Sequence, residues 1–298
     1  MKKEEAGVLD FFTLHKSLIE KRLEELIPSK KSPFSSLYDG ARYSLLAKSK
    51  RIRPLLCMAA VEILEGPLEQ SLDPSCALEL LHTYSLIHDD LPSMDDDDFR
   101  RGIPTLHKVT SEGHAILVGD YLLTYTFDVI ARSPFPSAIQ LELIKSLCAA
   151  AGGEGMVGGQ VMDLAMTGKK IPLNDLEFLH SHKTGALIKT SLLFGAIMAG
   201  ASSTEREILA SFGEKLGLLF QIVDDILDVT KPKQKHGTAI SGDAAKAKAT
   251  YVSLLGLDCA HEKAKMLFLS LSDILNQLPR DTFLLKEIAT NILSQIET

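Results

Sequence analysis

The sequence predicts an all-α protein, a single domain of about ten or more helices spanning residues 1–298. Apolar residues recur at helical spacing along most of the chain, whereas period-two strands and Asn-Gly hairpin turns do not stand out. Hydrophobic residues make up 45% of the chain, which is enough for a substantial core. Prolines, glycines and capping residues divide this pattern into segments, so we expect helices joined by short connections.

The first half of the chain predicts four helices. They cover residues 5–27, 35–47, 55–64 and 73–91. Pro28 stops the first helix, and Pro54 suits the first turn of the third. Asp73 is expected to be the N-cap of the fourth helix, with Pro74 at its first helical position. Pro92 ends that helix, because proline has no N–H and disfavours helical geometry at the residue before it.

The second half of the chain predicts further helices, interrupted by a polar loop. We place helices at residues 111–132, 137–166, 174–200 and 204–230, a polar loop at 231–242, and three closing helices after the loop. Thr204 and Glu207 have the spacing of a capping box, in which two side chains satisfy backbone N–H groups at a helix start. Asp281, which follows Pro279, is expected to cap the last helix.

Charge and cysteine usage exclude several classes of protein. The net charge of −7 argues against a nucleic-acid partner, which would require a basic face. The four cysteines (Cys57, Cys76, Cys148 and Cys259) have no paired spacing, so we expect small buried hydrophobes in a reducing compartment. We find neither a signal peptide nor an apolar stretch of the roughly 20 residues that a membrane span needs. The expected location is therefore the cytoplasm, without a membrane span.

Two acidic motifs carry the strongest functional signal. Asp-Asp-x₄-Asp lies at and beyond the end of the fourth helix, and Asp-Asp-x₂-Asp lies on the 204–230 helix. Their aspartates are Asp89, Asp90 and Asp95, and Asp224, Asp225 and Asp228. Such dense carboxylates repel one another unless cations lie among them, and Mg²⁺ prefers oxygen ligands. We expect the two motifs to face each other across a pocket and to hold Mg²⁺ ions that bind a diphosphate; the alternative for the first motif is a solvated acidic loop.

Basic residues accompany the acidic motifs at several places in the chain. They are Lys50, Arg53, Arg100, Arg101, Lys183 and Lys248. Arginine offers a fixed fork to phosphate oxygens, and lysine offers a point charge. Each of these residues alone would suit a protein surface, but together with the acidic motifs they favour a diphosphate ligand.

These motifs together resemble those of the trans-isoprenyl diphosphate synthases, and most closely those of the bacterial farnesyl diphosphate synthases. The resemblance is carried by residues 50–54, 82–98, 100–105, 158–160, 163–164, 182–185, 220–228 and 248–251, and it extends from about residue 35 to residue 260. It implies a helical bundle around a central tunnel. It also implies Mg²⁺-dependent condensation of isopentenyl diphosphate with dimethylallyl or geranyl diphosphate to farnesyl diphosphate.

The resemblance further implies a role for each matching residue and a homodimeric assembly. The family binds about three Mg²⁺ ions. Asp89 and Asp95 would bridge two of them, with Asp90 in support. Asp224 would hold the third ion, and Asp225 and Asp228 would act directly or through water. Arg100, Lys183 and Lys248 would contact the allylic diphosphate. Lys50, Arg53, His82 and Arg101 would bind isopentenyl diphosphate. Thr184 and Gln221 would lie near the developing carbocation.

Product length and departures from the family pattern leave alternatives open. Tyr84 and Ser85, just before the first motif, resemble the tunnel floor of C15 synthases, although a C20 (geranylgeranyl) synthase remains the alternative. The family's Gly-Gly before the first lysine is replaced by residues 48–49, and its Gly-Lys after the second motif by residues 237–238, unless Lys235 substitutes. Val252 replaces a usual proline.

Three other classes of protein fit the sequence less well. A terpene cyclase would not need the isopentenyl diphosphate residues. A non-catalytic regulatory homologue would fit the missing lysine but not the intact acidic motifs. A di-iron protein would need several Glu-x-x-His pairs, and only Glu177 with His180 matches.

Overall fold

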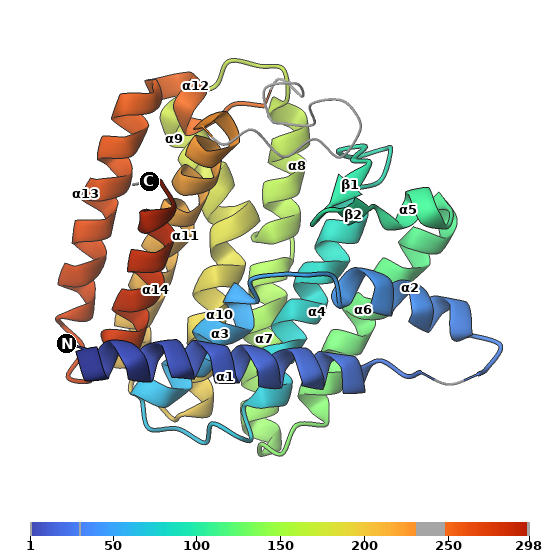
Figure 1. Ribbon diagram of the computed structural model, residues 1–298, viewed down its shortest axis with the longest axis horizontal. Helices are drawn as coiled ribbons and strands as arrows, with labels where there is room; N and C mark the ends of the chain where they lie inside the picture. The colour runs from blue at the N-terminus through green and yellow to red at the C-terminus, as the bar shows by residue number, and fades with distance from the viewer. Residues whose placement is uncertain (1, 30, 231–247, 297–298) are drawn as a thin grey trace. The chain divides into compact units, whose positions relative to one another are not determined.

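The structure, a computed structural model, describes residues 2–29, 31–230 and 248–296, with side chains from residue 11 onward. The polar loop at 231–242, with residues 237–238 and Lys235, lies outside the described residues. The helices are α1 (Lys2–Leu26), α2 (Ser35–Leu45), α3 (Ile52–Ile63), α4 (Leu72–Asp89), α5 (Leu106–Val109), α6 (Glu112–Ala131), α7 (Ser137–Ala151), α8 (Met156–Met166), α9 (Leu173–His180), α10 (Ala186–Met198), α11 (Ser203–Thr230), α12 (Tyr251–Leu255), α13 (Leu257–Leu275) and α14 (Phe283–Leu293). The prediction of an all-α fold is confirmed (Figure 1).

The chain divides into two compact units. The first comprises Met1–Met58 and Pro67–Ile144, and the second comprises Ala59–Gly66 and Lys145–Thr298. The prediction of a single domain stays a prediction. No described helix is long and apolar enough to cross a membrane.

Helix α4 is the core of the first unit. It packs along α6 and also contacts α1 and α2. Its leucines at positions 78, 80 and 81 are fully buried. Apolar and small side chains surround most of its circumference, as expected of a helix buried on all sides. Burial on several sides fixes the end of α4, which carries the first acidic motif.

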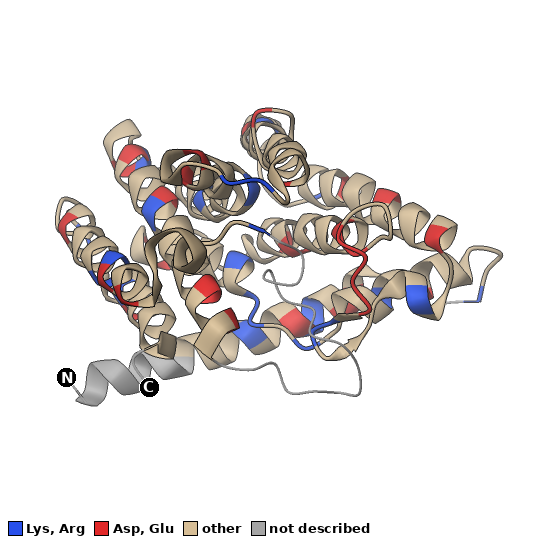
Figure 2. Ribbon diagram, turned by 90° about the horizontal axis from the view of Figure 1, so that it is seen from above, with Lys and Arg blue, Asp and Glu red and all other residues tan. Residues whose placement is uncertain are grey.

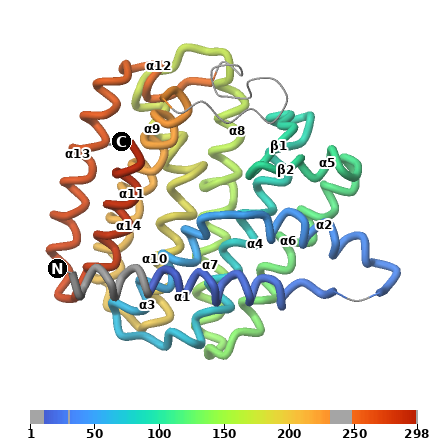
Figure 3. The backbone as a smooth tube through the Cα atoms, in the orientation of Figure 1, coloured from blue at the N-terminus to red at the C-terminus, as the bar shows by residue number. Residues whose placement is uncertain are grey.

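Helix α11 is the core of the second unit. It packs against α10, α13 and α14, and Figures 1 and 3 show α13 and α14 running beside it. Phe212, Leu216 and Leu219 are fully buried on its inner face, as predicted. The second acidic motif lies near the C-terminal end of this helix, which its packing holds in place.

Several helix boundaries differ from prediction. The helix expected at residues 137–166 breaks into α7 and α8, because three glycines within residues 152–155 weaken helical propensity. Helix α4 begins after Ser71, so Asp73 lies inside its first turn and pairs with Arg22 instead of capping it. The cap of α11 is formed by Ser202, whose N–H and hydroxyl contact Glu205 at 2.9 Å, two residues before the predicted pair.

Two smaller features were not predicted, and the prediction for the cysteines was partly wrong. Strands β1 (Phe99–Arg100) and β2 (Ile103–Pro104) form a two-stranded antiparallel hairpin. Each strand is too short to show an alternation of apolar and polar residues in the sequence. A π-helical turn, Ser181–Gly185, connects α9 to α10. Cys57 and Cys76 are buried as expected, but Cys148 and Cys259 are exposed, so the prediction of four buried cysteines was wrong for two of them.

Candidate active site

The first acidic motif folds back onto the end of α4. The helix ends at Asp89, before Pro92, as predicted. The backbone N–H of Asp95 donates to the carbonyl of Asp89 at 2.8 Å, and that of Asp97 donates to the carbonyl of Asp90 at 3.2 Å. These bonds bring the first and last aspartates of the motif close together. The acidic loop forms a red stretch in Figure 2, and Figure 3 shows the chain continuing from it into β1 and β2.

Asp90 is the ion-pair partner of Arg100. The Nε and Nη2 atoms of Arg100 lie 2.8 and 2.5 Å from Oδ1 of Asp90, and Nη2 also contacts Asp97 at 3.1 Å. Burial raises the pKa of Asp90 to about 6, against the opposing effect of the Arg100 charge. Asp90 therefore orients Arg100, and a supporting role for this aspartate in Mg²⁺ binding stays a prediction.

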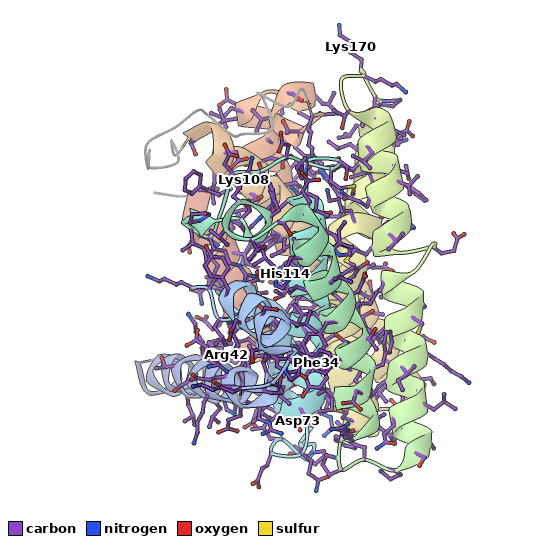
Figure 4. All side chains as sticks on the ribbon, turned by 90° about the vertical axis from the view of Figure 1, so that its right-hand side faces the viewer. Phe34, Arg42, Asp73, Lys108, His114 and Lys170 are labelled. Atoms are coloured by element: carbon purple, nitrogen blue, oxygen red, sulfur yellow. The ribbon has the colours of Figure 1, made fainter. Side chains whose placement is uncertain are left out.

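Lys108 holds the outer residues of the acidic loop. Its ammonium group, on α5, lies 2.8 Å from Asp98 and 3.8 Å from Asp96 (Figure 4 labels Lys108). Asp96 adopts a φ of 49°, in the left-handed region, which turns the loop sharply. These contacts give Asp96 and Asp98 a role in the loop's shape.

The four residues expected to bind isopentenyl diphosphate all belong to the first unit, and three of them gather around a buried carboxylate. Glu79 accepts from Arg51 at 2.8 Å and from Arg101 at 3.4 Å. Arg53 interacts electrostatically with both Glu79 and Arg101. We call Arg51, Arg53, Arg101 and Glu79 the arginine cluster. His82 lies near its three arginines, and Lys50 is exposed in the adjoining turn.

The arginine cluster has an excess of positive charge in a dry environment. Burial lowers the pKa of Arg53 to about 10, with Arg101 adding to the effect and Glu79 opposing it. Burial and then the neighbouring arginines hold the pKa of His82 well below its usual value, so its imidazole is neutral. Among the described residues, the Arg53 Nε and the Arg101 Nη1 are buried without a hydrogen-bond partner. Glu79 is a buried carboxylate beside three guanidinium groups, and Glu20, 4.0 Å from Arg51, is 46% exposed, so the cluster suits an anionic ligand.

Sequence reasoning missed Glu79 and Arg51. Both side chains are about 1% exposed, and Arg51 adopts a φ of 53°, in the left-handed region. Arg51 stands between Lys50 and Arg53, so its pairing with Glu79 fixes the turn that carries Lys50 and leads into α3, which carries Arg53. The available signal was a glutamate within the otherwise apolar run 76–81, because a buried carboxylate requires a cationic partner.

Tyr84 and Ser85 lie on α4 as expected. Tyr84 is half-buried, and its ring packs edge-on against the His88 ring with centroids 5.0 Å apart. The Ser85 hydroxyl donates to the carbonyl of His82 at 2.8 Å. Tyr84 therefore stands rather more than one helical turn before Asp89, held on one side by a histidine.

The second acidic motif presents three aspartates in different environments. Asp224 is exposed, Asp228 is half-buried and Asp225 is buried. The Asp225 carboxylate accepts from Gln221 Nε2 at 2.9 Å and from the backbone N–H of Tyr251 at 2.7 Å. Asp225 thus anchors the start of α12 to α11, and a metal role for this residue stays a prediction.

Thr184 and Gln221 are brought together, as are Lys183 and Lys248. The Thr184 hydroxyl donates to Gln221 Oε1 at 3.2 Å. The ammonium groups of both lysines contact Oδ2 of Asp163, at 2.6 and 2.9 Å. Asp163 belongs to a matching segment of the sequence, but no role was predicted for it.

A metal site is not assembled by the described side chains alone. Within residues 11–29, 31–230 and 248–296, no group of three or more His, Cys, Asp or Glu residues is arranged to hold a metal ion. The predicted pocket shared by the two acidic motifs stays a prediction.

A helical fold that carries two aspartate motifs and separate basic groups defines a class, the isoprenyl diphosphate synthases. The polyprenyl synthetase family model matches residues 35–288. The farnesyl diphosphate synthase of Geobacillus stearothermophilus is 45% identical over 260 residues, which cover 86% of this chain and 87% of that protein. The chloroplastic geranylgeranyl pyrophosphate synthase of Capsicum annuum is 46% identical over 250 residues, 83% of this chain and 67% of that protein.

A solved structure agrees with these sequence matches. The geranyltransferase of Helicobacter pylori, complexed with magnesium and isoprenyl diphosphate, has a TM-score of 0.86 and 36% identity, and 97% of each chain is covered. The chain therefore belongs to the polyprenyl synthetase family, and its enzyme class is that of the prenyltransferases.

Proposed function

We propose that the protein is a Mg²⁺-dependent farnesyl diphosphate synthase that joins isopentenyl diphosphate to dimethylallyl and then geranyl diphosphate. The observation that carries this proposal is the arginine cluster beside His82, in the first unit. A terpene cyclase binds one diphosphate and needs no second basic group, whereas a condensing enzyme binds two. The cluster supplies the charge that a second diphosphate requires.

The residues present fit Mg²⁺ and diphosphate. Asp89 and Asp95 are drawn together by a backbone hydrogen bond of 2.8 Å, and Asp224 is exposed on α11. We propose these three as the main ligands, supported by Asp90 through Arg100 and by Asp225 and Asp228 on α11. When bound, Mg²⁺ ions, about three by family resemblance, would neutralise the charge that develops on the leaving diphosphate.

The basic and polar residues would divide the remaining work. Arg100, Lys183 and Lys248 would bind the allylic diphosphate and stabilise its negative charge as the carbon–oxygen bond breaks. Lys50, Arg53, His82 and Arg101 would hold isopentenyl diphosphate so that its double bond attacks the cation. Neutral His82 donates a hydrogen bond without adding charge. Thr184 and Gln221, hydrogen-bonded to each other, would lie near the cation with their dipoles fixed.

Tyr84 favours a C15 product over a C20 product. The relatives named above include a farnesyl and a geranylgeranyl diphosphate synthase at nearly equal sequence identity. Overall similarity therefore does not decide the length of the product. A bulky aromatic ring before the first motif shortens the space for a growing chain. A geranylgeranyl diphosphate synthase is the second candidate, and the Capsicum annuum relative favours it.

We further propose a cytoplasmic homodimer. Helix α6 leaves Ile116 and Leu117 at 43% and 60% exposure, and adjacent large apolar side chains on one helix suit a partner surface. Light scattering on the purified protein should give twice the chain mass of 32.6 kDa. A monomer at micromolar concentration would contradict the proposed assembly.

Product analysis tests the proposed reaction. The purified protein is incubated with Mg²⁺, isopentenyl diphosphate and dimethylallyl diphosphate, and the prenyl alcohols are separated after phosphatase treatment. Farnesol is the expected product, and geranylgeraniol would favour the second candidate. A parallel incubation with farnesyl diphosphate alone should give no cyclic hydrocarbon. No condensation product of any length would refute the proposal and favour a regulatory homologue.

A further inference from the structure

Asp163 links three segments of the second unit through one oxygen atom. It lies on α8, Lys183 lies on the π-helical turn, and Lys248 lies just before α12. The ammonium groups of Lys183 and Lys248 contact the same oxygen, Oδ2, at 2.6 and 2.9 Å. The Asp163 side chain is about 12% exposed, and both lysines are largely buried beside it. Two ammonium groups that share one oxygen must lie close to each other.

The backbone around Asp163 is held in close contact. A Cβ atom added at Gly159, one helical turn earlier, would lie 2.4 Å from the backbone nitrogen of Lys183. Helix α8 and the π-helical turn therefore meet at main-chain distance, which only glycine permits here. Residues four apart share one face of a helix, so the Asp163 carboxylate points toward Lys183 from the same face.

Two ammonium groups share the one carboxylate of Asp163. Burial acts to raise the pKa of Asp163, but Lys183 and Lys248 outweigh it and hold that pKa below its usual value, so the carboxylate is ionised. His180, which also interacts with this carboxylate, is neutral because burial lowers its pKa to about 4. Each ammonium carries three N–H donors and directs one to Asp163.

We infer that Asp163 is a positioning residue for the allylic diphosphate: it holds the ammonium groups of Lys183 and Lys248 side by side, so that both reach one diphosphate. The inference rests on the proposed function of the two lysines. Without Asp163 the lysines repel each other and each flexible four-carbon stem is free to turn away. With it, the anion site is formed before the substrate arrives, which lowers the cost of ordering the lysines.

A purely structural role for Asp163 makes a different prediction. If Asp163 only fastened α8 to its neighbours, its loss would lower the melting temperature and the fraction of active enzyme, but each folded molecule would keep its kinetic constants. If Asp163 positions the lysines, kcat and KM change differently. The site becomes more positive without the carboxylate, so attraction for the diphosphate is kept while the geometry needed for ionisation is lost.

The test compares Asp163→Asn, Asp163→Glu and Glu214→Gln. Asparagine keeps the shape of the side chain and removes its charge, whereas glutamate keeps the charge on a longer stem. Glu214→Gln is the matched control, because Glu214 pairs with Lys189 at 2.5 Å in the same unit and takes no part in the proposed site. Active-site concentration, melting temperature, kcat and KM for geranyl diphosphate are measured for each variant and for the wild type.

The expected result is a divergence between the two kinetic constants. Asp163→Asn should lower kcat by roughly 10- to 100-fold, the range that misplaced contact groups produce, without raising KM for geranyl diphosphate. Asp163→Glu should recover part of that rate, and the control should match the wild type. An unchanged kcat per active site in Asp163→Asn, with or without a lower melting temperature, would overturn the inference. If the wild type itself forms no prenyl product, the proposed function has failed instead.

Discussion

Glu79 at the centre of the arginine cluster provides a sharp test of the site in the first unit. Its carboxylate is about 1% exposed and is the acidic partner of Arg51 and Arg101, at 2.8 and 3.4 Å. Glu79→Gln keeps the size of the side chain and one oxygen acceptor but removes the negative charge. The variant removes the buried counter-charge of the three guanidinium groups, and the carboxylate that remains near Arg51, that of Glu20 at 4.0 Å, is 46% exposed.

The magnitude follows from the burial of the pair. Removing one partner of a buried ion pair costs about 3–5 kcal/mol, because the other charge stays buried without compensation. Glutamine retains a hydrogen-bond acceptor, so we expect the lower end, a fall of about 3 kcal/mol in the free energy of unfolding. A turn that is no longer fixed by Arg51 should also misplace Lys50 and Arg53.

Urea denaturation and steady-state kinetics provide the two readouts. Glu25→Gln is the control, since Glu25 pairs with Arg22 at 3.1 Å on α1 but is 46% exposed. A surface pair of this kind contributes about 1 kcal/mol or less. Glu79→Gln should raise KM for isopentenyl diphosphate by roughly tenfold, equivalent to about 1.4 kcal/mol, and leave KM for geranyl diphosphate unchanged.

Two results would refute this reasoning. The first is a loss of stability no larger than that of the Glu25→Gln control. The second is an equal rise in KM for both substrates, since the arginine cluster is assigned to only one of them.

Three further predictions address product length, pH and packing. Tyr84→Ala should lengthen the product beyond C15, and identical product lengths in variant and parent would remove Tyr84 as the tunnel floor. Burial lowers the pKa of His180 to about 4, so the unfolded chain takes up a proton as pH falls from about 6.5 towards 4 and the folded chain does not. The free energy of unfolding should therefore fall by up to about 3 kcal/mol across that window. If the urea midpoint of His180→Gln depends on pH as steeply as that of the wild type, this prediction is wrong. Gly159→Ala should lower the melting temperature and kcat because its methyl group meets the Lys183 backbone; Gly113→Ala, with open space around it on α6, should leave both unchanged, and equal effects in the two would argue against the close contact.

Local signals predicted most helix boundaries. Pro92 stops α4 within three residues, and Ser111 accepts from His114 N–H at the start of α6 as a cap should. The break at residues 152–155 was also visible in the sequence as three glycines, but the apolar pattern on both sides of it outweighed them. Capping residues were misplaced because Ser202 and Thr204 offer competing registers, and only the packed structure selects one.

Contacts between distant residues could not be predicted. Arg51 and Glu79 are 28 residues apart, and Lys248 and Asp163 are 85 apart. Neither hydrophobic periodicity nor a helix-capping pattern links such distant residues. Their pairing depends on how the helices pack. The family resemblance assigned roles to lysines and arginines that face a ligand, and it did not assign the carboxylates that hold those cations in place.

The most direct test of the whole account is Mg²⁺-dependent condensation in variants of the two acidic motifs. Farnesyl diphosphate formation from geranyl and isopentenyl diphosphates is measured for the wild type, Asp89→Asn and Asp224→Asn, with a chelator and then with excess Mg²⁺. The wild type should lose activity with the chelator and regain it with Mg²⁺, and each variant should be slower by roughly 100-fold or more, because each removes a ligand from the ions that stabilise the leaving diphosphate. Wild-type rates in either variant would contradict the account.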